Sequence, residues 1–104
     1  VILSLKIGSI LPKSLNEIFN DEKIKKCDLL KLDCEGSEYE IIDSLEDKNF
    51  EKIEKMIIEY HLADSHPELL NKLKNKLKIK MYKISIEPLF DDIGFLYAIK
   101  KNKN

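Results

Sequence analysis

Two pairs of polar side chains follow two apolar segments of the sequence. Asp33 and Glu35 come at the end of one segment, and Glu59 and His61 come at the end of another. Residues i and i+2 of a strand face the same side, so each pair should begin on one face of its strand. If the two strands are neighbours, the four groups meet at one edge of a sheet. Open α/β sheets bind ligands at this edge, so the spacing predicts a functional site there.

These four side chains are compatible with two kinds of chemistry. Together they could bind a divalent cation through carboxylate oxygens and an imidazole nitrogen. We do not expect a metal as the main cofactor, because spacing within a strand does not fix the distance between strands. Alternatively, a neutral His61 or a carboxylate with a raised pKa could take a proton from a substrate hydroxyl. A structural explanation also stays open, in which Asp33 accepts hydrogen bonds from the following turn and His61 is a hydrogen-bonded loop histidine.

Other familiar catalytic patterns are absent from the sequence. No nucleophile elbow, G-x-G-x-x-G motif or P-loop occurs, and the three glycines are far apart. Gly36 follows Glu35 directly, where it would permit a tight turn or the close approach of a ligand. Cys27 and Cys34 are seven residues apart and lack a CxxC or Cys/His pattern, so neither a disulfide nor a zinc site is expected.

Helix signals recur three times in the form Ser-x-x-Glu, at Ser14–Glu17, Ser37–Glu40 and Ser65–Glu68. In such a capping box, the Ser and Glu side chains accept hydrogen bonds from free N–H groups at the start of a helix. Each box precedes apolar residues at helical spacing. We therefore predict three helices, the last with Pro67 in its first turn.

Short apolar runs between these helices indicate strands. Residues 29–32 and 56–60 are rich in aliphatic side chains, as buried parallel strands are. Residues 78–87 and 94–101 alternate apolar and polar side chains, which predicts a terminal antiparallel pair joined by a loop that contains Pro88. The opening VILSLKI could add an edge strand. Strands alternating with helices predict an α/β fold with a parallel sheet.

Composition narrows the choice of partners. The chain has 104 residues, enough for one domain or part of one, and its net charge is −1. All 18 basic residues are lysine, which disfavours nucleic-acid recognition because arginine forks usually read bases and phosphates. No apolar run approaches the ~20 residues that span a bilayer, so we expect no membrane insertion. The free cysteines suggest a reducing, cytoplasmic location.

The segment CDLLKLDCEGSEYEII resembles FkbM-type methyltransferases, together with SLNEIF before it and IEKMIIEYH after it. In that family a strand reads hydrophobic-Asp-(Val/Ile)-Glu-Gly-(Ala/Ser)-Glu, and a later strand ends in Glu-x-His. The residues from Asp33 to Glu40 carry the specific part of the resemblance, with Cys34 in place of the usual aliphatic residue. Asn16 stands where an Asp is common, and the weaker similarity extends from about Leu11 to the end of the sequence.

The resemblance implies a Rossmann-like methyltransferase sheet that uses S-adenosylmethionine, with residues 1–104 as a single partial domain, the C-terminal half. The glycine-rich cofactor loop of the family is not visible in the sequence. Asp33 and Gly36 would lie at the cofactor. The acceptor would be a sugar or another small hydroxylated compound, which is O-methylated. Its hydroxyl would be positioned or polarised by the four predicted site residues, Asp33, Glu35, Glu59 and His61.

A second interpretation assigns the chain no catalysis. A truncated α/β module would leave a sheet edge open, and such an edge can pair with another chain. The chain would then act as a homodimer or through a protein partner. An upstream coding sequence for a strand and a glycine loop would favour the enzyme, whereas a genuine start at Val1 would favour the module.

Overall fold

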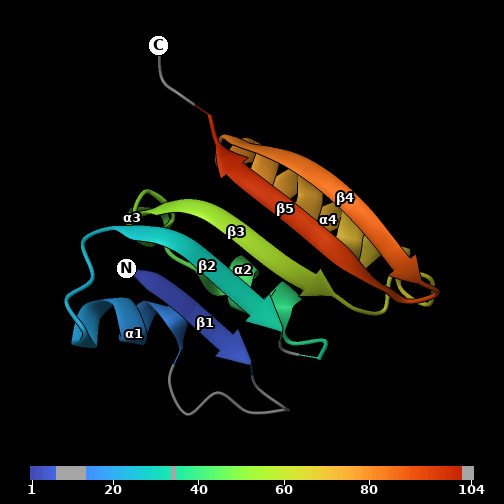
Figure 1. Cartoon of the computed structure of the whole chain (residues 1–104), viewed down its shortest axis with the longest axis horizontal. Coiled ribbons are helices and arrows are strands. Elements are labelled where there is room, and N and C mark those ends of the chain that lie inside the picture. The colour runs from blue at the N-terminus through green and yellow to red at the C-terminus, as the bar shows by residue number, and fades with distance from the viewer. Residues whose placement is uncertain (7–13, 34, 102–104) are drawn as a thin grey trace.

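The computed structural model describes residues 1–6, 14–33 and 35–101, in which five strands form one sheet in the order β1-β2-β3-β5-β4 (Figure 1). Helices connect the strands, so the predicted α/β fold is confirmed. The strands are β1 (Ile2–Lys6), β2 (Cys27–Asp33), β3 (Ile53–Tyr60), β4 (Tyr82–Phe90) and β5 (Ile93–Lys100). The helices are α1 (Leu15–Asp21), α2 (Glu38–Ser44), α3 (Asp47–Phe50) and α4 (Pro67–Ile79).

The sheet contains a parallel part and an antiparallel part. Strands β1, β2 and β3 are parallel neighbours, as the alternation of strands and helices predicts. Strand β5 pairs antiparallel with both β3 and β4, which confirms the predicted terminal pair. Strand β1 lies at one edge, so the opening residues do form the edge strand expected of them. The carboxyl ends of β2 and β3 consequently meet at the same edge of the sheet.

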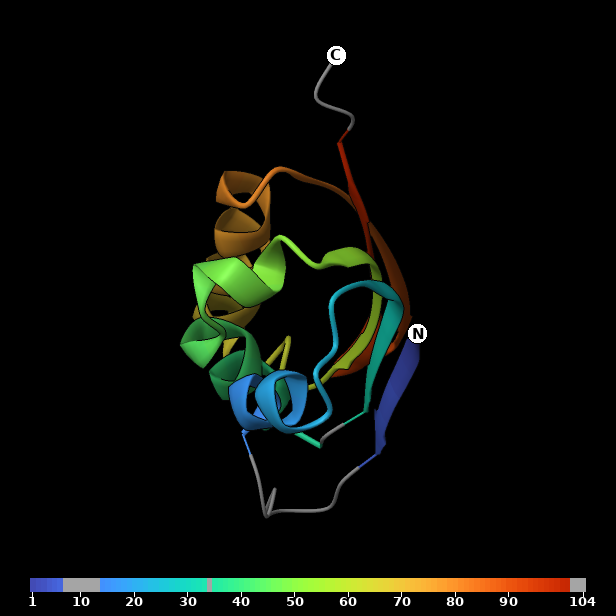
Figure 2. The same ribbon diagram turned by 90° about the vertical axis from the view of Figure 1, so that its left-hand side faces the viewer.

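The described helices all lie on one face of the sheet, as Figure 2 shows. Alternate residues of the central strands point toward the helices and are buried, among them Leu30 and Leu32 of β2 and Met56 and Ile58 of β3. They pack in one hydrophobic cluster with Leu77 of α4 and other helix residues. The period-2 alternation puts the intervening residues on the other face, which no described helix covers.

The three predicted capping boxes have different outcomes. At α1 the box is complete, because the Ser14 hydroxyl accepts from the Glu17 N–H and the Glu17 carboxylate accepts from the Ser14 N–H. At α2 the box predicted at Ser37 is wrong, since Ser37 already has helical dihedral angles and its hydroxyl makes no cap bond. At α4 the helix begins at Pro67 with His66 as N-cap. Ser65 instead bonds to Asp92 across the neighbouring loop.

Two boundaries in the last third of the chain also differ from the prediction. Residues 78 and 79, expected in a strand, complete α4. Pro88, expected in a loop, lies within β4 opposite Gly94, next to an irregularity of the ladder between Pro88 and Phe90. Proline is tolerated there because β4 is the outer strand, so a missing N–H need not break a ladder hydrogen bond on that side.

Short helix α3 has no counterpart in the prediction. Its four residues are too few to produce a helical pattern in the sequence. The segment is fixed by Asn16 of α1, whose side-chain oxygen accepts hydrogen bonds from the Glu46 N–H at 3.0 Å and the Asn49 side chain at 2.8 Å. Asn49 is fully buried. A contact across 33 residues thus determines this helix.

Two remaining expectations concern cysteines and membranes. Cys27 is buried with a free thiol, while Cys34, Gly8 and Leu11 lie outside the described residues. Among the described helices, none is long and apolar enough to cross a membrane.

Candidate active site

Strands β2 and β3 place Asp33 and Glu59 side by side. The parallel register pairs Leu32 with Ile58, and Asp33 and Glu59 are the next residue on each strand. Because Leu32 and Ile58 point into the core, the two acids point to the opposite face at the carboxyl edge of the sheet. The predicted meeting of these acids at one edge is therefore confirmed.

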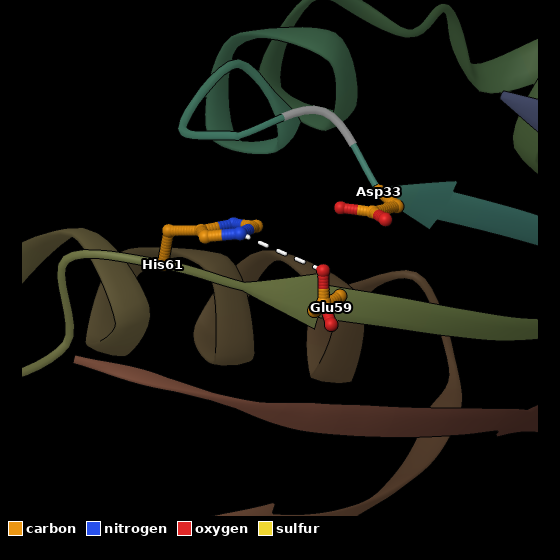
Figure 3. A group of neighbouring side chains, drawn as sticks. All are labelled: Asp33, Glu59 and His61. Carbon is orange, nitrogen blue, oxygen red and sulfur yellow. Dashed lines mark ion pairs between the residues drawn. The ribbon is translucent and has the colours of Figure 1, made fainter. Parts of the chain in front are cut away.

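His61 follows β3 and joins the two acids. Its ring atom Nε2 lies 3.6 Å from the Glu59 Oε2 atom, the contact dashed in Figure 3. Figure 3 also shows the Asp33 carboxylate directed toward the same space from the end of β2. One ligand-type atom from each of the three side chains lies within 4.8 Å of the other two. All three side chains are partly buried, so they remain accessible to a small molecule.

A fourth residue, Glu38 of α2, fixes the orientation of the His61 ring. The Glu38 Oε2 atom lies 3.2 Å from His61 Nδ1 and accepts the His61 backbone N–H at 3.0 Å. A carboxylate can only accept hydrogen bonds, so this contact places the ring hydrogen of a neutral His61 on Nδ1. The lone pair on Nε2 then faces Glu59.

Glu38 is itself held rigidly. Its side chain is 0% exposed, and its second oxygen accepts the Gly36 N–H at 2.8 Å. Next to it on α2, the Tyr39 hydroxyl donates to the backbone oxygen of His61. Burial, repulsion by Glu38 and other effects raise the pKa of Tyr39 to about 12, so the phenol keeps its hydrogen for this bond. Helix α2 thereby anchors the end of β3 at two points.

The loops around the site adopt uncommon backbone conformations. Glu35 has φ +46° and Gly36 has φ +106°, directly after β2, and Leu62 has φ +62° directly after His61. An added Cβ at Gly36 would meet only Leu62 at an ordinary 3.8 Å, so the dihedral angle and not space requires glycine. Left-handed residues other than glycine are uncommon and cluster at functional sites, which supports a role for this edge.

The two neighbouring carboxylates perturb each other. Hydrogen bonding to Asp33, burial and repulsion by Asp33 raise the pKa of Glu59 above its ordinary value of 4.5, and nearby His61 opposes this in part. A raised pKa means that the site retains a proton more readily than a solvated carboxylate does. Asp33 and Glu59 can therefore share a proton, which is the kind of pair that serves acid–base chemistry.

Glu35 does not join this cluster. Strand β2 ends at Asp33, and Glu35 lies exposed in the turn before α2. The expectation that Asp33 and Glu35 share one face of a strand is therefore wrong, because β2 ends at Asp33 and Glu35 has a left-handed φ of +46°. The sequence prediction also missed Glu38, although it stands within the segment that carries the family resemblance, in the first turn of a helix after an apolar strand.

A hollow of about 250 Å³ opens beside the two acids on the uncovered face of the sheet. Residues of four strands line it, and among them Ile57 and Phe95 alternate with core residues and so present apolar side chains on this face. Phe95 lies directly opposite Glu59 in the antiparallel ladder between β3 and β5. The hollow thus combines an apolar wall with two carboxylates at one side, a combination that suits a small ligand with polar groups.

Comparison with known protein families supplies the decisive observation. The family model of the methyltransferase FkbM domain matches residues 12–81, which are 70 of the 104 residues. The chain belongs to the FkbM methyltransferase family. No curated protein and no solved structure matches it significantly.

The match to the FkbM domain spans the whole cluster, from Asp33 at the end of β2 to His61 after β3. Methyltransferases commonly use S-adenosylmethionine, which supplies an activated methyl group on a positively charged sulfur. Two carboxylates beside an apolar hollow, those of Asp33 and Glu59, attract positively charged or hydrogen-bond-donating ligands. This edge of the FkbM domain is therefore its candidate active site.

Proposed function

We propose that this chain forms the acceptor side of an S-adenosylmethionine-dependent methyltransferase site that O-methylates a sugar or another small hydroxylated compound. The observation that carries the proposal is the convergence of Asp33, Glu59 and His61 within 4.8 Å at the carboxyl edge of the parallel strands. Family membership supplies the reaction class. The mixed polar and apolar lining of the adjacent hollow supports a small, hydroxylated acceptor.

The three side chains would have different roles in activating a hydroxyl of the acceptor. As the acceptor oxygen forms a bond to the methyl carbon, its proton must leave to a base. The Nε2 lone pair of His61 is directed toward the cluster and can take that proton. Asp33 and Glu59 can accept hydrogen bonds from the acceptor and hold it in line. Orientation of this kind contributes strongly to displacement reactions, because it removes translational and rotational freedom in advance.

Binding and turnover provide the test. S-adenosylmethionine is titrated calorimetrically into this chain and into the chain extended upstream in its gene. Formation of S-adenosylhomocysteine is then followed with a panel of free sugars and nucleotide sugars. We expect heat and acceptor-dependent product at least with the extended chain. The absence of both from both proteins would overturn the proposal.

Substitutions then test the assignment of residues. Asp33→Asn and His61→Gln should each lower turnover by at least about tenfold while the protein stays folded. Glu35→Gln measures whether the exposed acid outside the cluster takes part. The matched control is Glu40→Gln, an exposed acid of α2. Turnover of Asp33→Asn equal to that of the control would remove Asp33 from the site.

One observation favours a second candidate, a binding module that acts as a dimer or with a protein partner. No described helix covers the other face of the sheet (Figure 2). The strand register puts Ile2 and Ile99 on that face, where they are 67% and 51% exposed. Covering this face by a second copy would bury them. Light scattering after gel filtration measures the mass. A dimer that Ile99→Lys dissociates would support this candidate, and a monomer at all concentrations would oppose self-association.

A further inference from the structure

Three atoms that could bind a metal ion lie close together at the edge of the sheet. They are a carboxylate oxygen of Asp33, a carboxylate oxygen of Glu59 and, in the tautomer that Glu38 favours, the Nε2 atom of His61. Groups that all accept hydrogen bonds repel one another unless something positive lies between them. Either shared protons or a cation must therefore compensate the cluster.

From this arrangement we propose that Asp33, Glu59 and His61 bind a divalent metal ion, with Mn²⁺ as the best-suited type. Each residue contributes one ligand atom, and the three atoms lie within 4.8 Å of one another. Two ligands on opposite sides of an ion at about 2.1 Å lie ~4.2 Å apart. Ligands at right angles around the ion lie ~3.0 Å apart. Small side-chain rotations can bring three atoms that all lie within 4.8 Å of one another to such separations.

The surroundings of His61 are those of a metal-binding histidine. In metal sites the second ring nitrogen is usually bonded to a carboxylate or a carbonyl, which fixes the tautomer and makes the ligand atom more basic. The fully buried Glu38 does this for Nδ1 of His61 at 3.2 Å. Glu38 is in turn held by the Gly36 N–H, so the orientation of the ring does not depend on the metal. Glu38 therefore fixes both the backbone and the ring of His61 without belonging to the proposed ligand set.

The donor set selects among metal ions. Two carboxylate oxygens favour hard ions such as Mg²⁺ and Mn²⁺, whereas an imidazole nitrogen favours transition metals over Mg²⁺. Mn²⁺ satisfies both preferences. Three protein ligands leave about half of an octahedral shell for water or for a ligand in the adjacent hollow. If the proposed methylation is correct, on which this one step rests, the acceptor hydroxyl would bind the ion there and release its proton to solvent, because the Nε2 lone pair of His61 would then be held by the ion and could not act as the base.

Metal binding is tested on the chain alone, without methyl donor or acceptor, so that its failure is distinct from failure of the proposed function. MnCl₂ is titrated into the protein at neutral pH, and free Mn²⁺ is measured by electron paramagnetic resonance. We expect saturable binding of one ion per chain, with a dissociation constant below about 1 mM. Thermal unfolding in the same solutions should shift to higher temperature, because the ion binds the folded state.

Variants localise the ion. Asp33→Asn, Glu59→Gln and His61→Gln should each weaken Mn²⁺ binding at least about tenfold. The matched control is His66→Ala, which removes the histidine of an exposed His–Glu pair at 3.3 Å and should leave binding within about twofold of the wild type. Circular dichroism checks that each variant is folded. Binding that is absent, or equal in Asp33→Asn and His66→Ala, would overturn the proposal in favour of shared protons.

Discussion

Replacing Glu38 by Gln tests whether the buried carboxylate organises the site. The change preserves size but converts one acceptor oxygen into an N–H₂ donor. Glu38 accepts three hydrogen bonds, from the Gly36 N–H at 2.8 Å, the His61 N–H at 3.0 Å and His61 Nδ1 at 3.2 Å. If the amide oxygen keeps the bond to Gly36, its N–H₂ group faces the two His61 donors. The ring can change tautomer and present an acceptor, but the backbone N–H of His61 would be left without an acceptor.

The contacts of Glu38 set the expected loss in the free energy of unfolding. A hydrogen bond to a charged group is worth about 1.5–3 kcal/mol, and a buried donor left without a partner costs about 1–3 kcal/mol. Water cannot relieve the mismatch because the Glu38 side chain is 0% exposed. We therefore expect Glu38→Gln to lower the free energy of unfolding by about 3 kcal/mol. Domains of this kind are stabilised by only about 5–15 kcal/mol in total, so the loss is readily measured.

Urea denaturation followed by circular dichroism is the appropriate assay. With an m value of about 1.5 kcal/mol/M, the midpoint should fall by about 2 M. The control is Glu40→Gln, an exposed acid in the same turn of α2, which should change stability by less than about 0.5 kcal/mol. A Glu38→Gln protein as stable as this control would refute the view that the carboxylate holds His61 in place.

Three further predictions concern other parts of the chain. Hydrogen bonding to Asp33 is the first cause of the raised pKa of Glu59. The free energy of unfolding should therefore fall as pH rises from about 4.5 through the folded-state pKa. In thermal melts between pH 4 and 8, the melting temperature of Glu59→Gln should rise relative to that of the wild type, and parallel curves would contradict this. Gly94→Ala places a Cβ against the Tyr60 side chain. Calorimetry should show that the free energy of unfolding falls by about 1–3 kcal/mol. An unchanged melting temperature would be inconsistent with that clash. Ser14→Ala removes a capping box, so the free energy of unfolding measured in urea should fall by about 1 kcal/mol. Ser37→Ala should cost less, because the Ser37 hydroxyl makes no cap bond. Equal losses in the two variants would argue against the capping box at Ser14.

The sequence by itself was enough to predict the order of the main elements and the edge at which the site lies. Aliphatic runs and helical spacing depend only on near neighbours in the chain, so β2, β3 and the longer helices could be predicted from them. Topological rules for parallel strands then place Asp33 and Glu59 at one edge. Their contact in the structure follows from that local information together with the register of β2 and β3.

Details that depend on distant segments could not be predicted in this way. Helix α3 forms where Asn16 binds Asn49 across the fold. Pro88 remains in a strand because β4 lies at the edge of the sheet, which no local pattern reveals. The spacing of Asp33 and Glu35 suggested a shared face, but β2 ends at Asp33 and Glu35 lies in a turn with φ +46°.

The chemistry of the site was likewise decided by tertiary structure. In the sequence Glu38 looks like an ordinary acid in the first turn of a helix. Only folding brings it against His61, 23 residues away, and removes it from water. Burial makes its hydrogen bonds strong and its removal costly, because no solvent can replace them. Sequence therefore determined which residues reach the edge of the sheet, whereas packing of α2 against the end of β3 determined the orientation and the neutral-ring tautomer of the imidazole there.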